Sequence, residues 1–174
     1  MVSGKDSGER ATRKTMTKTR ELLKARFACA RQDLEKALQR LTDPDLPWSP
    51  REGMRTIANQ LVEIANKEKE TLGWVQTGVW PDEEPDAFNA ETATVAEIRT
   101  VLAELRAETY AYIDSLSDTA LEQPISNPNR WIEALRIPEC PLSEVLRSIA
   151  THEVYHTGQL YIYLWMRGDD PNQW

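Results

Sequence analysis

Hydrophobic residues recur every three or four positions in four long segments of the chain, a spacing that places them on one face of an α-helix. The segments cover about residues 14–41, 51–75, 94–116 and 141–168. Four amphipathic helices are therefore predicted. The hydrophobic positions expected in their shared core are Leu23, Phe27, Ala30, Leu34, Leu38, Leu41, Met54, Ile57, Leu61, Ile64, Ala65, Leu72, Ile98, Val101, Leu102, Leu105, Tyr112, Leu116, Leu146, Ile149, Leu160 and Tyr163.

Local signals mark several of the helix ends. The first helix is followed by "TDPDLPWSP", whose three prolines cannot continue a helix. Thr94 is a suitable N-cap for the third helix, and Glu97 stands three residues later, as in a capping box. The fourth helix is expected to begin at Pro141 or Leu142 and to end at Gly168.

No segment shows the alternation of a β-strand, and no internal repeat is visible, so we predict an all-α fold, a four-helix bundle. Because long connections follow the second and third helices, the bundle need not have a simple up-and-down order. The acidic connection is expected to be exposed over residues 79–92. Residues 13–174 are predicted to form a single domain behind a disordered polar leader, residues 1–12.

Composition narrows the classes of function. The formal net charge of −7 argues against nucleic-acid binding, which needs a basic surface. No apolar run approaches the length of a membrane span, and the first residues lack the apolar core of a secretory signal. The two cysteines, Cys29 in a helical segment and Cys140 in a loop, form no disulfide pattern. We therefore expect a cytoplasmic protein, with Cys29 serving in packing.

The only two histidines, His152 and His156, stand four residues apart in "THEVYHTGQL". On a helix this spacing brings both imidazoles to one face, where they can bind one metal ion. The alternative is that each histidine donates to an acceptor inside the bundle. The stretch also matches H-E-x-x-H, which would make Glu153 the general base of a zinc hydrolase. That alternative is remote, because no histidine or glutamate follows His156 to complete such a site.

A third metal ligand would then come from upstream, and carboxylates are the strongest candidates. In the second helix, "RTIANQLVEIANKE" places Gln60 and Glu63 on one stripe beside the apolar face. Glu63 belongs either to a solvated helix edge or to a site between helices. Periodicity alone favours the solvated edge, because glutamates on helices are mostly exposed.

These segments resemble the DinB/YfiT-like family of four-helix-bundle metalloproteins. Its fourth helix carries H-x-x-x-H, often followed by a small residue, Gly and Gln, as in "HEVYHTGQL". Its second helix is similar to "TIANQLVEIANKE", with the family's histidine falling on Glu63. The resemblance implies a divalent metal ion, zinc or nickel, held by Glu63, His152 and His156. An alignment shifted by three residues would place Gln60 there instead.

The resemblance also implies two classes of function. Some family members are metal-dependent thiol S-transferases, which add an external low-molecular-weight thiol to an electrophilic small-molecule substrate. The alternative is a non-catalytic metal-binding bundle or a stress-response protein. Because homodimers are common in the family and the chain is rich in tryptophan and tyrosine, we also expect self-association as a two-fold dimer.

Overall fold

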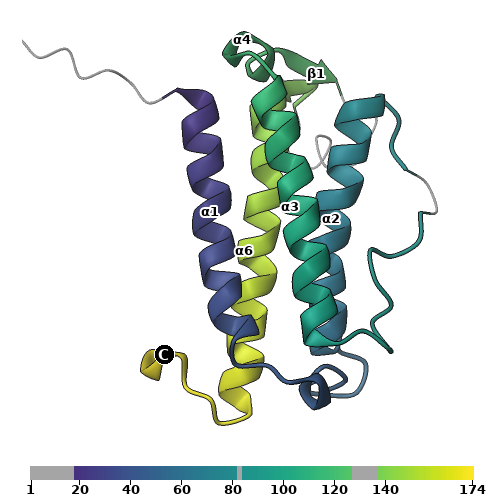
Figure 1. Ribbon diagram of the computed structural model, residues 1–174, viewed down its shortest axis with the longest axis vertical. Helices are drawn as coiled ribbons and strands as arrows, with labels where there is room; N and C mark the ends of the chain where they lie inside the picture. The colour runs from purple at the N-terminus through teal and green to yellow at the C-terminus, as the bar shows by residue number, and fades with distance from the viewer. Residues whose placement is uncertain (1–17, 82–83, 127–136) are drawn as a thin grey trace, which may run out of the picture.

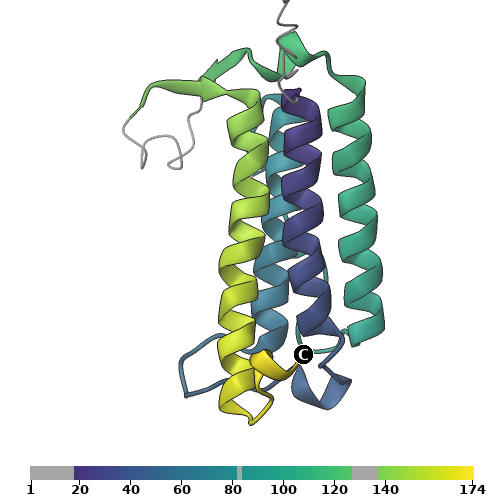
Figure 2. The same ribbon diagram turned by 90° about the vertical axis from the view of Figure 1, so that its left-hand side faces the viewer.

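Four long helices make up most of the structure, a computed structural model that describes residues 18–81, 84–126 and 137–174. The helices lie side by side with their axes close to parallel (Figures 1 and 2). The predicted all-α bundle is therefore confirmed. The long helices are α1 (Thr19–Leu38), α2 (Ile57–Thr77), α3 (Val95–Ser115) and α6 (Leu142–Met166).

The order of the helices is not a simple up-and-down one. In Figure 1, α2 and α3 run in the same direction, because the connection between them returns along the outside of α2. Helix α6 runs opposite to α2 and packs mainly against α1 and α2. The α2–α6 interface is therefore antiparallel, and its facing residues are numbered in opposite directions.

Short elements fill the connections. Within the described residues, two short strands, β1 (Pro124–Ser126) and β2 (Glu139–Pro141), form an antiparallel pair in which Ile125 faces Cys140. The sequence did not predict them, because strands of three residues are too short to show alternation. The short elements are η1 (Asp43–Asp45), α4 (Asp118–Leu121), β1 (Pro124–Ser126), β2 (Glu139–Pro141) and η2 (Pro171–Gln173).

Helix α2 begins later than its hydrophobic pattern suggested. The expected start near residue 51 is wrong, because Thr56 is the N-cap and its side chain accepts a hydrogen bond from the Asn59 amide at 3.1 Å. Met54, expected in the core, lies before the helix and is 47% exposed. The capping box of Thr94 and Glu97 at the start of α3 is present as predicted.

The acidic connection after α2 is only partly exposed in its described part, which leaves out residues 82 and 83. Val79 is 70% exposed, as expected, but Phe88 packs partly buried against the core. Asn66 of α2 holds this segment in place, since its side chain accepts from the Ala87 amide at 2.8 Å and donates to Asp86 at 2.6 Å. The prediction of a fully exposed connection is therefore wrong around Phe88.

Most of the predicted core positions are buried, among them Phe27, Leu34 and Leu61. Val101, Leu105, Tyr112 and Leu116 are only partly buried, as expected for residues at the edge of a helix face. Cys29 is exposed and Cys140 is buried, so the expectation that Cys29 serves in packing is wrong. Among the helices described, none is long and apolar enough to cross a membrane.

The interior of the bundle also contains four charged side chains, one from each long helix. Arg31 of α1, Glu68 of α2, Arg106 of α3 and Glu153 of α6 form two positive and two negative charges in direct contact. Both carboxylates are almost completely buried. We call these four residues the interior ion-pair cluster.

Each arginine of the cluster binds both carboxylates. Arg106 donates to Glu68 at 2.7 and 3.1 Å and to Glu153 at 2.5 Å. Arg31 donates to Glu153 at 2.9 Å and lies 3.4 Å from Glu68. The guanidinium groups also donate to the backbone carbonyls of Phe27 and Leu102. The buried charges are therefore both paired and hydrogen-bonded, which is the condition for charge in a protein interior.

The protonation of Arg106 reflects this pairing. Burial alone would lower the pKa of its guanidinium, but the hydrogen bond and charge of Glu68, together with Glu153, raise the pKa above its ordinary value. Arg106 therefore stays charged beside the two carboxylates.

We predict that Arg106→Met destabilises the protein by about 3–5 kcal/mol, because it leaves two buried carboxylates with only Arg31 as partner. The matched control is Arg99→Met on the same helix, since Arg99 pairs with Glu35 at the partly exposed surface. That change should cost about 1 kcal/mol or less. Urea denaturation measures both free energies, and equal losses in the two variants would contradict the role of the cluster.

Candidate metal centre

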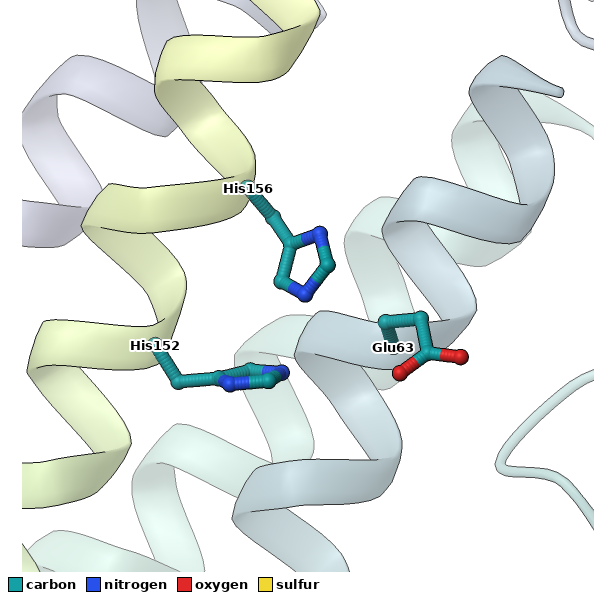
Figure 3. Close-up of side chains that lie close together, drawn as sticks. All are labelled: Glu63, His152 and His156. Atoms are coloured by element: carbon teal, nitrogen blue, oxygen red, sulfur yellow. The ribbon is translucent and has the colours of Figure 1, made fainter. Parts of the chain in front are cut away.

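The two histidines of α6 point to the same side of the helix. His152 and His156 lie one turn apart, with their ring centroids 4.4 Å from each other. Figure 3 shows both imidazole rings projecting from α6 toward α2. His156 is buried and His152 is partly buried. The i, i+4 spacing thus brings two imidazoles together at the interface between α2 and α6.

Glu63 completes a group of three potential ligands. One ligand atom from each of Glu63, His152 and His156 can be chosen so that all lie within 4.8 Å of one another. Glu63 comes from α2, so the group spans the interface of two helices (Figure 3). Its side chain is 37% exposed and pairs with Arg55 at 2.7 Å. Glu63 therefore lies at the solvated edge of α2 and still faces the imidazoles, so both sequence interpretations describe part of its position.

Burial keeps both imidazoles neutral. Burial is the main cause that lowers the pKa of His152 to about 4, and the nearby His156 and Lys67 act in the same direction. Burial also lowers the pKa of His156, partly offset by the charge of Glu63. Neutral imidazoles keep the lone pairs that a metal ion requires, so protons do not compete for these nitrogens near neutral pH.

One nitrogen of the group lacks a hydrogen-bond partner. The Nε2 atom of His152 is buried, and no described residue bonds to it. A buried polar atom without a partner is costly in a protein interior. A divalent cation between the three side chains would satisfy it. Two neutral nitrogens and one carboxylate oxygen also match the donors that zinc and related ions accept, so the residues present fit such an ion.

Gln60 lies beside the group but is not placed as a ligand. Its Oε1 atom is 2.5 Å from Nδ1 of His156, and its Nε2 atom donates to the hydroxyl of Tyr163 at 3.1 Å. The amide is therefore used in hydrogen bonds at both ends. Among the described residues, Glu63 offers the third potential ligand atom of the candidate metal centre, while the Gln60 amide contacts His156.

Glu153 does not act with the histidines, although the H-E-x-x-H pattern places it between them. Its carboxylate is 1% exposed and is bound by Arg31 and Arg106 in the interior ion-pair cluster. A general base must reach a water molecule or a substrate. The structure therefore gives the zinc-hydrolase alternative no catalytic base at this position.

An open pocket of about 540 Å³ adjoins the candidate metal centre, and His152 forms part of its wall. Positive charge comes from Lys67 and Arg147, while Glu144 forms an ion pair with Arg147. Burial lowers the pKa of the Lys67 ammonium group. The remaining lining residues are Ser148, Thr151 and Tyr155.

The sequence pattern places Lys67 on the same stripe of α2 as Glu63, but it did not identify a pocket there, and Arg147 was missed. Lys67 follows Glu63 by one helical turn, and Ser148 precedes His152 by one turn. Residues four apart share a helix face. Considering the residues one turn away from each expected ligand would therefore have identified Lys67 and Ser148, which line part of this pocket.

Comparisons with known proteins give the family of the chain. The family model of the DinB superfamily matches residues 26–160. Among curated proteins, none matches. Among the solved structures that share the fold, three are described next, and their identities of 16–18% support the fold alone.

The first of these structures is an uncharacterized protein from Clostridium difficile 630, with a TM-score of 0.66 and 16% identity over 86% of this chain and 97% of the other. The second, from Streptococcus pneumoniae, has a TM-score of 0.63 and 18% identity over 86% and 91% of the two chains. The third, a conserved protein from Enterococcus faecalis, has a TM-score of 0.62 and 17% identity over 85% and 95%. With the family model matching most of its length, the chain belongs to the DinB superfamily.

Proposed function

We propose that the protein is a metal-dependent S-transferase that adds an external low-molecular-weight thiol to an electrophilic small molecule. One observation carries the proposal: His152 belongs both to the candidate metal centre and to the wall of the adjoining pocket. A small molecule in that pocket would therefore lie next to the ion. This is the arrangement that a reaction at a metal-activated group requires.

The donor set supports a divalent ion with an open coordination position. Glu63, His152 and His156 supply three ligands, and zinc or nickel accepts at least four. With a single carboxylate, the site keeps one net positive charge. When bound, the ion would favour the thiolate form of an incoming thiol, which is the form that attacks an electrophile.

The reaction is a substitution in which a carbon–sulfur bond forms. With a chlorinated nitrobenzene as substrate, the thiol sulfur would attack the ring carbon that bears chlorine. Chloride would leave with the electron pair of the broken bond, and the thiol proton would pass to water. The substitution reaction therefore needs no oxidant or reductant.

The residues of the pocket would bind and orient the reactants. Glu144 offsets the charge of Arg147, so with Lys67 the wall carries one formal net positive charge, which favours an anionic group on the thiol or substrate. Neither cysteine of the chain is among the described residues that line this pocket. The sulfur nucleophile would therefore come from an external thiol.

We predict that protein purified without a metal-affinity tag contains about one zinc or nickel ion per chain. His156→Ala should abolish this binding, because it removes one of two nitrogen ligands, and Glu63→Gln should weaken it strongly, because it removes the only charged ligand. Elemental analysis after exhaustive dialysis measures the metal content.

The matched control for Glu63→Gln is Glu104→Gln, which changes an exposed glutamate of α3. This variant should keep the metal content of the wild type. If Glu63→Gln also kept it, Glu63 would not be the third ligand.

We predict that the metal-loaded protein consumes thiol when a chlorinated nitrobenzene is supplied. A Cys29→Ala, Cys140→Ala double variant should keep this activity, since the nucleophile is external. His152→Ala should abolish both activity and bound metal. Thiol loss is followed with a colorimetric thiol reagent. Consumption no faster than the uncatalysed background, over a panel of thiols, would favour the non-catalytic metal-binding or stress-response alternative.

The protein is also proposed to form a two-fold dimer through the outer face of α6. Several large hydrophobic side chains on this helix are exposed, and monomeric proteins seldom display such a group together. At about 100° per residue, the positions of these side chains fall on one side of α6, which we call the apolar stripe. The exposed residues are Val154, Tyr155, Ile162, Trp165 and Met166.

We predict a mass in light scattering of about twice the 19.9 kDa chain at micromolar concentration. Ile162→Glu should shift the protein toward the monomer, because it places a charge in the apolar stripe. Val79→Glu, at a position that is 70% exposed outside α6, is the matched control and should leave the mass unchanged. A monomeric wild type would contradict the dimer.

A further inference from the structure

We propose that Gln60, Tyr163 and the Arg55 backbone form a positioning chain, which fixes the tautomer of His156 so that Nε2 presents its lone pair to the ion. This inference rests on the proposed metal centre. It assigns a role to three residues that are not ligands. The chain is a run of directional hydrogen bonds, and the chemistry at one end determines the direction of every bond in it.

The run begins at the backbone carbonyl of Arg55, just before the N-cap of α2. A carbonyl oxygen can only accept a hydrogen bond. The hydroxyl of Tyr163 lies 3.2 Å from this oxygen, so Tyr163 must donate its single proton there. The phenol oxygen is then left as an acceptor for its second neighbour.

The second neighbour is the side-chain amide of Gln60. Because the phenol proton is already used, the amide must present its NH₂ group to Tyr163, at 3.1 Å. The amide oxygen then faces the other way and lies 2.5 Å from Nδ1 of His156. The two amide ends cannot exchange without placing two donors or two acceptors in contact, so the orientation of Gln60 is fixed.

The amide oxygen in turn requires a donor, and Nδ1 of His156 must carry the ring proton. In a neutral imidazole the other nitrogen, Nε2, then has the lone pair. In Figure 3 one ring nitrogen of His156 points toward His152 and Glu63, while the other points away from them. Since Nδ1 is bound by Gln60, the nitrogen available to an ion is Nε2.

Burial makes this chain selective. Gln60, Tyr163 and His156 are each no more than 4% exposed, so water does not readily replace a missing partner. An unsatisfied buried polar group is costly. With the ring proton on Nε2, Nδ1 of His156 and the amide oxygen of Gln60 would be two acceptors in contact, with no donor between them. Partners of this kind, which orient a ligand without touching the metal, commonly change metal affinity by about 10- to 100-fold when removed.

Arg55 also connects the two kinds of ligand. Its backbone carbonyl ends the chain that orients His156, and its guanidinium group binds one oxygen of Glu63 at 2.7 Å. The second oxygen of Glu63 remains for an ion. A single residue at the start of α2 therefore fixes both an imidazole ligand and the carboxylate ligand.

The first test is the tautomer itself, measured by long-range ¹H–¹⁵N NMR on metal-free protein at neutral pH. The chain has only two histidines, so a His152→Ala variant leaves His156 as the only signal. We expect the proton on Nδ1. A proton on Nε2 in the wild type would overturn the inference, whatever the protein does with metals.

The second test compares two variants of one residue. Gln60→Leu removes the acceptor, so His156 should populate both tautomers, and Zn²⁺ affinity against a competing chelator should fall about 10- to 100-fold. Gln60→Glu keeps an acceptor at the same place, so the Nδ1–H tautomer and most of the affinity should remain. Tyr163→Phe frees the amide to rotate and should again mix the tautomers. A structural role alone would affect stability in these variants but not the tautomer.

The outcomes separate the inference from the proposed function. If the wild type shows the Nδ1–H tautomer and Gln60→Leu mixes it, but neither protein binds Zn²⁺, the positioning chain stands and the metal centre fails. If the wild type binds Zn²⁺ and Gln60→Leu binds it equally well with an unchanged tautomer, the metal centre stands and the positioning chain is refuted.

Discussion

The interior ion-pair cluster is the constraint on which the arrangement of the four helices depends. Its charges come from all four long helices, and each carboxylate is bound by both arginines. Helix α6 must turn Glu153 toward the arginines, which fixes its rotation about its own axis. His152 precedes Glu153 by one residue, or about 100° around the helix, and is thereby directed toward α2. The cluster thus positions the candidate metal centre without contributing to it.

The same interaction explains why H-E-x-x-H has a different meaning here. In a zinc peptidase the glutamate is free to act on water. In this protein the glutamate is the most deeply buried carboxylate of α6, and its partners are two arginines. Losing either arginine would leave buried charge unpaired, so the glutamate serves the bundle rather than catalysis. The two histidines and the glutamate of one short motif therefore belong to two separate polar groups.

Much of the fold could be predicted from the sequence, because helical periodicity depends only on neighbouring residues. The partnership of His152 and His156 was predictable for the same reason. Periodicity could not decide whether Gln60 or Glu63 is the third potential ligand, since both lie on one stripe of α2. Their different roles depend on where α6 lies. The resemblance to the DinB family pointed to Glu63, where periodicity favoured solvent. The role of Glu153 was not predictable from periodicity either, because its arginine partners come from other helices.

The polar groups between α2 and α6 also fix how these two helices slide along each other. Because the helices are antiparallel, Gln60 meets His156 and Tyr163, while Glu68, two turns further along α2, meets the arginines that bind Glu153. An apolar interface tolerates small shifts, since one hydrophobic contact replaces another. Buried hydrogen bonds do not, because a shift of one residue would leave several donors and acceptors unsatisfied at once. The hydrogen bonds of Gln60 and the ion pairs of Glu68 therefore fix the register that places Glu63 opposite the histidines.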